Sequence, residues 1–395
     1  MAEYIWQNPN WPGFTWDQPS LMQQLIEVHT NQGILEGQML ALGFKAQSEG
    51  NLRRFADEIQ KSFEIEGEKI SGYSLRSSIA RHLGLDSGEQ LDKPRTKVDA
   101  IVQVVTDAVN NCQLPLTEER LFGWHQKLFH PNSVGMGFNG LYSVRSGSYR
   151  TDEEGPMRVV SGNGRNETVH FEAPPAQILP AQLRQFIEWV NAPASETPGG
   201  SAVKSAVSHL YFVTLHPFED GNGRLARAIA DMVLCRGDST ERRDEQQNAG
   251  SHDSVPVLRS DHLFSMSAQL CRERGDYYSC LESTQRQESL DITQWIQWYL
   301  GCMNRAVLNA LTEIEQGQKR ARFWDYAESA GINDRQRKML SMLLDDFKGK
   351  LTSTKYAKIC SCSHDTASRD IARLVNIGLL RKGESGGRST EYFMK

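Results

Sequence analysis

Apolar residues recur at helical spacing along most of the chain. Leu21, Leu25, Val28 and His29 fall on one face of a first helix, and a longer amphipathic run follows to about Gln60. The same spacing predicts further helices over residues 74–83, 96–111, 116–130, 180–191 and 201–215, from the glycines at 221–223 to about 235, and from about 261 to 330. Thr117 is the expected N-cap of the helix over 116–130. These patterns predict a mainly α-helical protein.

The helical pattern stops between about residues 138 and 175. Short β-prone runs at 157–162 and 167–174 flank a Gly-Asn-Gly-Arg-Asn stretch, which predicts a two-stranded hairpin. A second interruption, at 236–260, is polar and aperiodic, and it is longer than an ordinary loop. We expect it to be a surface insertion.

Length and composition narrow the class of protein. A chain of 395 residues predicts two or three domains, and 39% hydrophobic residues exclude wholesale disorder. No apolar run approaches the about 18 residues that span a bilayer, and no leader pattern is visible at the N-terminus. Seven scattered cysteines are typical of reduced thiols. We therefore expect a cytoplasmic protein with no membrane partner, and the net charge of −5 argues against a chain devoted wholly to nucleic acid.

The segment from residue 216 to 227, HPFEDGNGRLAR, has the parts of an anion-binding helix start. Unpaired N–H groups at a helix N-terminus attract anions, and Gly221, Asn222 and Gly223 would let a phosphate approach them closely. Arg224 and Arg227 are three residues apart, so both can reach further phosphate oxygens from one helix face.

Two more side chains in this segment suit phosphate chemistry. Asp220 is an oxygen ligand of the kind that Mg²⁺ prefers, and Mg²⁺ commonly bridges nucleotide phosphates. His216 is the side chain nearby that can accept a proton near pH 7. A proton acceptor, a metal ligand, a phosphate-binding helix start and two arginines thus occur in one short segment. Together they predict a site of phosphoryl or nucleotidyl transfer.

This segment resembles the signature of the Fic family, whose pattern is HPFx(D/E)GNGRxxR, and it matches every specified position. The resemblance covers roughly residues 95–315. It implies transfer of AMP from ATP to a hydroxyl of a target protein, which could be the chain itself. By that resemblance, His216 would deprotonate the Ser, Thr or Tyr hydroxyl and Asp220 would hold Mg²⁺.

The resemblance assigns the remaining signature residues to the nucleotide. Gly221, Asn222 and Gly223 would cradle the phosphates, while Arg224 and Arg227 would hold the β and γ ends. Tyr277 and Tyr278 occupy the place of a Tyr pair that lines the nucleotide pocket in many relatives. The predicted hairpin would be a flap that pairs with the target backbone, through either Val159–Ser161 or Thr168–His170. The second GNGR string, Gly162–Arg165, is interpreted as a turn between strands.

Upstream, Ser62, Glu66 and Gly67 match an inhibitory motif, (S/T)xxxE(G/N), of Fic proteins that carry a brake before the catalytic core. The resemblance implies that Glu66 reaches Arg227 and blocks a productive position of the γ-phosphate. A charged helix face is the alternative interpretation of this short pattern. In some relatives the same Glu also helps to remove AMP, and the sequence leaves that open.

The C-terminal part, from Lys348 to Lys395, has ten Lys and Arg against four Asp and Glu, a local charge of +6. Its pattern of helix, turn, helix and Gly-rich hairpin resembles a winged helix, whose second helix here begins near Ser363 and carries Arg369 and Arg373. Winged helices bind DNA, dock proteins or dimerise, and the sequence does not choose among DNA, a protein partner and a homodimer. Cys360, Cys362 and His364 lack a fourth ligand for zinc, so we expect no zinc site there.

The sequence thus predicts three parts: a helical N-terminal region over 1–94 with the inhibitory motif, a Fic catalytic core with a hairpin flap over 95–330, and a winged helix over 331–395. The favoured function is AMP transfer from Mg·ATP, with ATP as substrate, restrained by Glu66. The alternatives are transfer of another phosphate-linked group, such as UMP, phosphocholine or phosphate, and a DNA-binding regulator whose Fic core senses a nucleotide.

Overall fold

The computed structural model describes residues 3–42, 44–68, 70, 75, 78–79, 97–129, 134–137, 140–153, 155–162, 168–238, 263–345, 347–383 and 390–395. The chain forms two compact units, Met1–Thr312 and Glu313–Lys395. Each is described by itself.

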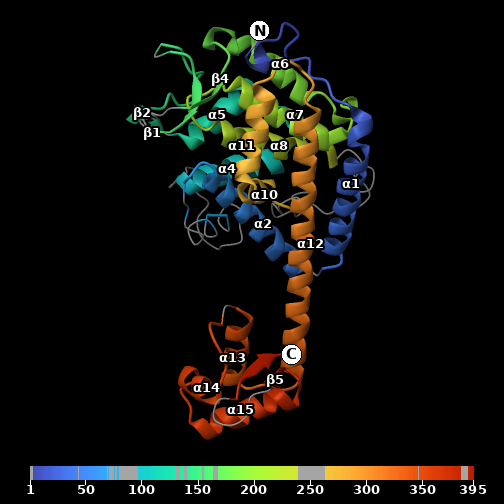
Figure 1. Cartoon of the computed structure of the whole chain (residues 1–395), viewed down its shortest axis with the longest axis vertical. Coiled ribbons are helices and arrows are strands. Elements are labelled where there is room, and N and C mark those ends of the chain that lie inside the picture. The colour runs from blue at the N-terminus through green and yellow to red at the C-terminus, as the bar shows by residue number, and fades with distance from the viewer. Residues whose placement is uncertain are drawn as a thin grey trace, which may run out of the picture. The chain divides into compact units, whose positions relative to one another are not determined.

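Unit 1 is mainly helical, as predicted (Figure 1). Its α-helices are α1 (Gln18–Leu40), α2 (Phe44–Ile65), α4 (Lys97–Asn110), α5 (Glu118–Leu128), α6 (Leu179–Asn191), α7 (Gly200–Leu215), α8 (Asn222–Asp238), α10 (Met266–Arg272), α11 (Arg274–Gln285) and the first part of α12 (Thr293–Ser329). Two antiparallel hairpins join β1 (Val134–Gly137) to β2 (Gly140–Ser143) and β3 (Arg158–Ser161) to β4 (Thr168–Glu172). Short 3-10 turns lie at Ile5–Gln7, Ala176–Ile178 and Ala194–Glu196.

The β3–β4 hairpin is confirmed, whereas the β1–β2 hairpin was not anticipated. The single helical stretch predicted over 261–330 is wrong in detail, because it is divided into α10, α11 and α12. One break has a clear cause: Thr15 N–H donates to Leu290 O, and Ile292 N–H donates to Thr15 O, both at 2.9 Å. These bonds to the N-terminal arm take the backbone around 290–292 out of a helix. His29 is exposed, so it is not on the buried face of α1.

α7 is the central helix of unit 1. Every side chain from Ala202 to Leu215 is buried, as expected for a helix that is covered on all sides. It packs along α8 and α6. Ser205 Oγ donates to Ala230 O of α8 at 3.1 Å, so a buried polar side chain is satisfied at this interface. The position of α8, and of the loop before it, is therefore set by a rigid neighbour.

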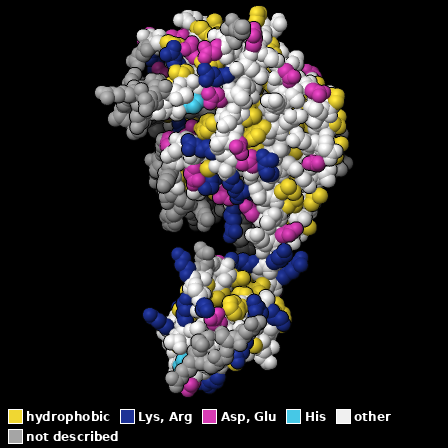
Figure 2. All heavy atoms as spheres, in the orientation of Figure 1, with side chains coloured by type: hydrophobic (Ala, Val, Ile, Leu, Met, Phe, Trp, Pro, Cys, Tyr) yellow, Lys and Arg dark blue, Asp and Glu magenta, His cyan; other side chains and the backbone are white. Residues whose placement is uncertain are grey.

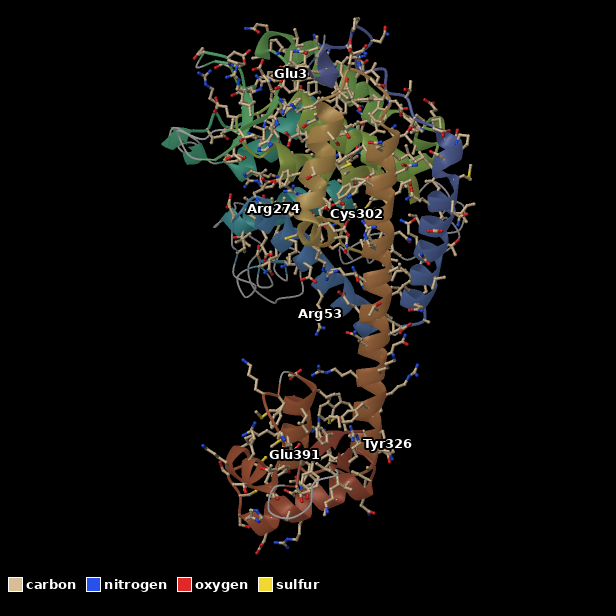
Figure 3. All side chains as sticks on the ribbon, in the orientation of Figure 1. Glu3, Arg53, Arg274, Cys302, Tyr326 and Glu391 are labelled. Carbon is tan, nitrogen blue, oxygen red and sulfur yellow. The ribbon has the colours of Figure 1, made fainter. Side chains whose placement is uncertain are left out.

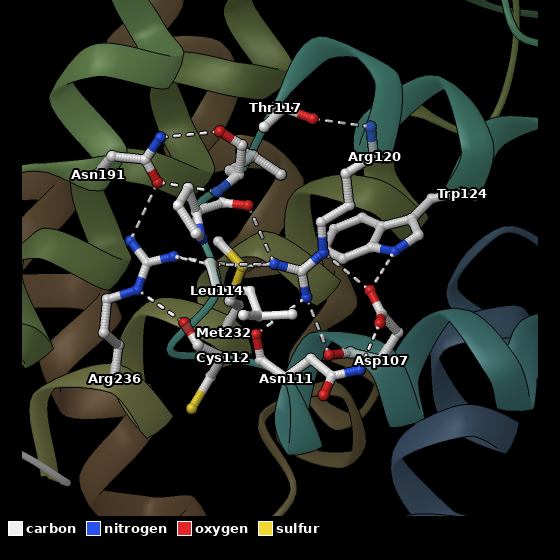
Figure 4. A network of polar contacts seen from close by, with 12 residues as sticks. Asp107, Asn111, Cys112, Leu114, Thr117, Arg120, Trp124, Asn191, Met232 and Arg236 are labelled. Atoms are coloured by element: carbon white, nitrogen blue, oxygen red, sulfur yellow. Dashed lines mark hydrogen bonds and ion pairs between the residues drawn. The ribbon is translucent and has the colours of Figure 1, made fainter.

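A network of polar contacts holds the far end of α8 against α4 and α5 (Figure 4). Asp107 of α4 accepts from Arg120 Nε and from Trp124 Nε1, each at 2.8 Å. Arg236 of α8 donates to Cys112 O at 2.8 Å and to Val190 O at 3.0 Å. Burial alone would raise the pKa of Asp107, but hydrogen bonds from Asn111, Arg120 and Trp124 outweigh it and hold this pKa below its usual range.

Unit 2 consists of the end of α12, three further helices and a small hairpin. The elements are α13 (Asp334–Leu344), α14 (Ser353–Ile359), α15 (His364–Asn376), β5 (Leu380–Lys382) and β6 (Tyr392–Met394). Tyr356, Ile371 and Leu374 lie in its core. Figure 3 labels Tyr326, whose hydroxyl donates to Ile377 O at 2.7 Å. Ser363 is the N-cap of α15, accepting from Thr366 N at 3.2 Å, so the predicted start of this helix is confirmed.

Charged side chains are frequent on the face of unit 2 drawn in Figure 2. Arg369 is exposed on α15, but Arg373 donates to Ala330 O and Gly331 O, and it thereby caps the end of α12. Among the described residues, no group of three His, Cys, Asp or Glu side chains is placed to hold a metal ion. Nor does any helix in the described ranges have the length and apolarity that a membrane span requires.

Replacing Asp107 with alanine should lower the free energy of unfolding by about 2 kcal/mol, because Arg120 and Trp124 each lose a partly buried acceptor. Urea unfolding followed by circular dichroism would measure the change. Asp325→Ala, at an exposed position of α12, is the control and should have little effect. Equal midpoints for the two variants would contradict a stabilising role for this network.

Candidate active site

The predicted signature lies at the junction between α7 and α8. α7 ends at Leu215, and its C-cap His216 adopts a left-handed conformation (φ 49°, ψ 55°) while its N–H still bonds Phe212 O at 3.0 Å. Pro217 follows and cannot continue the helical hydrogen bonding. The chain then turns through Phe218–Asp220 and enters α8 at Asn222.

Asn222 closes this turn. Its Oδ1 accepts from Phe218 N at 3.0 Å, and its Nδ2 donates to Phe218 O at 2.7 Å, so the buried amide joins both main-chain groups of one residue. Gly221 has φ +81°, and a Cβ built there would lie 2.6 Å from the Phe129 ring. Glycine is therefore required at 221 by the backbone angle and by packing. The Asn222 side chain therefore closes the loop, and its amide does not face the predicted phosphate-binding position.

The protonation of His216 follows from its contacts. Nδ1 lies 3.2 Å from Val213 O, and because a carbonyl only accepts, Nδ1 carries the hydrogen and Nε2 keeps its lone pair. Burial lowers the pKa of His216 to about 4, so the imidazole is neutral at pH 7. A neutral ring with Nε2 unprotonated can accept a proton.

Arg150 holds the backbone of His216 and was not identified from the sequence as a site residue. Its Nε donates to His216 O at 2.7 Å and its main-chain N–H to Pro217 O at 3.0 Å. The same buried guanidinium pairs with Asp152 at 2.8 Å and bonds Pro174 O, just after β4. It thus connects His216 to the chain before β3 and to the chain after β4. Sixty-six residues separate Arg150 from His216, so no local motif could have indicated it.

Asp220 is held by its main chain from one side and by its carboxylate from the other. His125 Nδ1 accepts from Gly147 N–H at 2.9 Å, which leaves the proton on Nε2, 3.2 Å from Asp220 O. Burial lowers the pKa of His125 to about 4, which keeps this tautomer neutral. Asp220 Oδ1 accepts from Gly221 N at 2.5 Å and from Arg224 Nη2 at 3.2 Å.

Two aromatic rings lie close to the guanidinium of Arg224. Its guanidinium is within 5.0 Å of the Phe129 ring centre and 5.6 Å of the Phe63 ring centre. Nη1 also lies 3.2 Å from Glu68 Oε1, just beyond the end of α2. Arg224 is thus already paired with two carboxylates, those of Asp220 and Glu68.

Arg227 is bound by the predicted inhibitory motif. Its Nε donates to Ser62 Oγ at 2.9 Å, and its Nη2 donates to Ser62 O and to Glu66 Oε1, both at 2.8 Å. A Cβ built on Gly223 would lie only 2.4 Å from Glu66 Oε1, so the carboxylate rests directly over that glycine. Arg227 Nη1 is buried and has no hydrogen-bond partner within the described residues.

Glu66 and Arg227 each stabilise the charged form of the other. Burial alone would raise the pKa of Glu66, but Arg227, with help from Arg224 and Arg274, outweighs burial and holds this pKa below its usual range. Burial lowers the pKa of Arg227, yet Glu66 more than compensates and raises it. Gly67 follows with φ +80°, a conformation that glycine adopts easily at the end of α2.

The predicted tyrosine pair lies on α11. Tyr277 is buried, and its hydroxyl is 2.9 Å from His209 Nε2, while Tyr278 is 38% exposed with the Arg274 guanidinium 5.5 Å from its ring centre. Burial lowers the pKa of His209 to about 3, so it is a neutral packing residue. The phenols also affect the pKa of Arg227, which indicates that α11 borders the same site.

The structure therefore brings together every predicted site residue within one region of unit 1. Three predicted features lie wholly or partly outside the described residues. They are Asn163–Arg165 of the second GNGR string, the 239–260 part of the predicted insertion, and most of the predicted helix over 74–83.

The residues present fit a nucleotide with a divalent cation. Glu66 marks an anion position over Gly223, and Arg227 keeps one buried N–H group unpaired beside it. Asp220 offers one carboxylate, and one protein carboxylate together with phosphates and waters is a usual environment for Mg²⁺.

Comparison with known proteins identifies the segment that contains the signature. Residues 115–234 match the Fic/DOC family. The chain carries a Fic domain. Residues 4–85 match a domain of unknown function, DUF4172, so α1, α2 and the N-terminal arm belong to a region separate from the Fic match. The predicted family resemblance is thereby confirmed.

Two curated relatives resemble the Fic domain over short stretches. The chain is 33% identical over 64 residues to a probable protein adenylyltransferase of Aquifex aeolicus, covering 16% of this chain and 19% of the relative. It is 34% identical over 55 residues to protein adenylyltransferase fic-1 of Caenorhabditis elegans, covering 14% and 11%. The matches thus span less than a fifth of either relative. A crystal structure of a Fic family protein from Desulfovibrio desulfuricans aligns over 94% of this chain and 96% of its own, with 17% identity and a TM-score of 0.46.

The His216 ring should remain neutral well below the ordinary histidine pKa of about 6.5. In a ¹H–¹³C NMR titration, its ring signal should not shift between about pH 8 and pH 5.5, because protonation of the ring begins only near the lowered pKa of about 4. The signal missing from His216→Ala assigns the resonance. A midpoint near pH 6.5 would contradict the proton assignment given above.

Proposed function

We propose that this protein transfers AMP from Mg·ATP to a Ser, Thr or Tyr hydroxyl of a target protein. The observation that carries the proposal is the convergence of His216, Asp220 and Arg227 at one helix junction of a Fic domain. The names of the curated relatives support the same reaction class.

In this reaction the target hydroxyl oxygen forms a bond to the α-phosphorus, and the bond from that phosphorus to the bridging oxygen of pyrophosphate breaks. His216 Nε2 takes the hydroxyl proton, and Arg150 keeps the ring in place through the His216 carbonyl. Arg224 and Arg227 bind the departing phosphates. Asp220 would hold Mg²⁺, which supplies positive charge against the phosphate oxygens.

The same contacts support restraint by Glu66. A γ-phosphate bound to Arg227 would compete for the guanidinium that Glu66 now holds at 2.8 Å, and it would bring like charge against this carboxylate. The carboxylate also occupies the space over Gly223 where a phosphate would approach the helix start. The ground state is therefore an inhibited one, and ATP binds productively only when Glu66 moves away.

Other phosphate-linked groups are less well supported than AMP. Glycine at 223 leaves the helix start without a side chain that would redirect the nucleotide. All seven cysteines are free thiols, in keeping with a reaction in the cytoplasm, where ATP is available.

A second candidate is a DNA-binding regulator with a nucleotide-sensing core. It is favoured by the +6 charge of residues 348–395 and by exposed Arg369, Arg381 and Lys382 in unit 2. We propose that this unit is a winged helix. The engagement of Arg373 at the end of α12 makes the DNA-facing surface smaller than its sequence implies.

Incubation with ATP labelled on either the α- or the γ-phosphate distinguishes these functions. We expect covalent protein label from α-labelled ATP only, lost in His216→Ala, because AMP retains the α-phosphorus. Label from γ alone would indicate phosphorylation. Absence of label in both the wild type and Glu66→Gly would favour the nucleotide sensor.

Glu66→Gly should increase the rate of AMP transfer by at least about tenfold, because Arg227 then becomes available to the nucleotide. The matched control is Glu64→Gly, two residues away on α2, since Glu64 pairs with Lys61 at the end of that helix and its loss should leave transfer unchanged. Equal rates for wild type and Glu66→Gly would remove the inhibitory role from the proposal.

A further inference from the structure

The β3–β4 hairpin has little apolar support of its own. Among its described residues only Phe171 is buried, and the ring of Tyr4 covers it edge-on at 5.3 Å between ring centres. Tyr4, Phe171 and Ala173 form a separate small core, with Trp6 and Met157 packed against it. Two of these five side chains come from the N-terminal arm, Glu3–Phe14.

The hydrogen bonding of the hairpin defines its outer edges. Ala173 N donates to Met157 O at 2.9 Å, so by the alternation of an antiparallel ladder Arg158 and Glu172 turn their main-chain groups outward. The register skips His170, and the next outward pair is Val160 with Val169. Each strand therefore directs two residues away from its partner.

The outer edge of β4 is already occupied. Trp6 Nε1 donates to Glu172 O at 2.7 Å, and Arg286 Nη1 lies 3.4 Å from Val169 O. The outward carbonyls of β4 thus accept from the arm and from the residue that ends α11. An incoming strand could not pair with β4 without displacing both.

A series of side-chain hydrogen bonds also connects α11 to the hairpin. His170, the residue that the register skips, places Nδ1 2.8 Å from Glu282 Oε2 and Nε2 2.6 Å from Ser161 Oγ. Arg286 pairs with Glu3 of the arm at 3.0 Å and with Glu282 at 3.4 Å. Arm, α11 and β4 are therefore joined on the same side of the hairpin.

The arm is itself fixed to the core, so it can hold the hairpin in place. Trp11 packs edge-on against Tyr211 of α7 at 5.3 Å, and its indole N–H donates to Gln182 of α6 at 2.9 Å. Asn8 donates to Glu288 O at 2.8 Å. The two Trp11 contacts are with α7, whose C-cap is His216, and with α6, which packs along α7.

We propose that the N-terminal arm is a target-positioning element: it covers the edge of β4, fixes the flap relative to His216, and leaves the edge of β3 to pair with an extended segment of the target. This inference rests on the proposed function, and it assigns a role to the first part of the region that matches the domain of unknown function. The partner is a polypeptide strand with a hydroxyl side chain, bound through its main chain and therefore with little demand on its sequence. The residues of β3 that turn outward are Arg158, which is exposed, and Val160, which is half-buried.

Paired proline substitutions in the Glu66→Gly protein test the assignment of the edge. Val160 and Val169 face each other across the hairpin and both turn outward, so Val160→Pro and Val169→Pro remove equivalent N–H groups from β3 and β4. With α-labelled ATP and the proteins of a soluble cell extract as acceptors, we expect Val160→Pro to reduce labelling at least tenfold and Val169→Pro to reduce it no more than about threefold. Equal labelling of the two variants, whether high or low, or the reverse order, would overturn the assignment of the edge.

Hydrogen exchange tests the arm without any reaction. Trp6→Phe keeps an aromatic ring but removes the indole N–H that reaches Glu172 O and part of the ring that packs on the Phe171 core. Amides of residues 168–172 should therefore exchange about fivefold faster, while those of α7 remain unchanged. Trp11→Phe is the matched control in the same arm, since its indole N–H bonds Gln182 instead, and it should leave the flap amides as they are. Equal flap exchange in the two variants would overturn the role of the arm.

The two experiments separate the failure of each idea. If Glu66→Gly labels no protein at all, the proposed reaction fails, and the exchange rates still decide whether the arm holds the flap. If Glu66→Gly labels proteins and Trp6→Phe in that background raises the KM for the acceptor proteins with kcat nearly unchanged, the arm acts through target binding. A fall in kcat alone would overturn the positioning role.

Discussion

The ion pair between Arg227 and Glu66 is the interaction on which the organisation of the site depends. A guanidinium that is almost wholly buried needs compensation, because an unpaired charge in such a place is strongly destabilising. Ser62 of α2 and Glu66, directly after its end, supply it from more than 160 residues earlier in the chain. The residue that makes α8 suited to bind phosphate is thus the residue that fastens α2 to it. Under the proposed function, inhibition and stability of the nucleotide-free state have the same physical origin, and ATP must replace a good ligand of Arg227 rather than fill an empty place.

The other parts of the site act by limiting motion around this pair. Asn222 closes the loop before α8, and Gly221 packs where any side chain would strike Phe129. Arg150 and His125 hold main-chain carbonyls at the two ends of the same loop, those of His216 and Asp220. Buried, satisfied contacts of this kind keep catalytic groups in place before substrate binds, which is a large part of what a protein contributes to phosphoryl chemistry.

The sequence predicted what is encoded locally. The helices, the β3–β4 hairpin, the N-caps at Thr117 and Ser363, and the whole signature at the junction of α7 and α8 followed from periodicity and motif. What it missed is encoded by pairs distant in the chain. Arg150 gains its role only when the fold brings it to His216, and the helix predicted over 261–330 is interrupted because Thr15 of the arm bonds the backbone there. Helix periodicity contains no information about such partners, since the intrinsic preference of a segment is weak against tertiary hydrogen bonds.

The region before the Fic domain reaches the site from two sides, with opposite consequences. Its second helix brings Glu66 to Arg227, and its first residues bring Tyr4 and Trp6 to the flap. Under the two proposals, the first contact opposes ATP binding, while the second holds the strand pair that an incoming target would use. A detachable inhibitor would show only the first effect. If both proposals hold, relief of inhibition would come from movement of α2 near Glu66, with the arm remaining on β4, rather than from release of the whole region. The arm and α2 have separate anchors. Trp11 holds the arm on α6 and α7, whereas α2 is held by Arg227 of α8 and, through Glu58, by Ser265 and Ser267 at the start of α10. Movement near Glu66 therefore need not disturb the contacts of the arm.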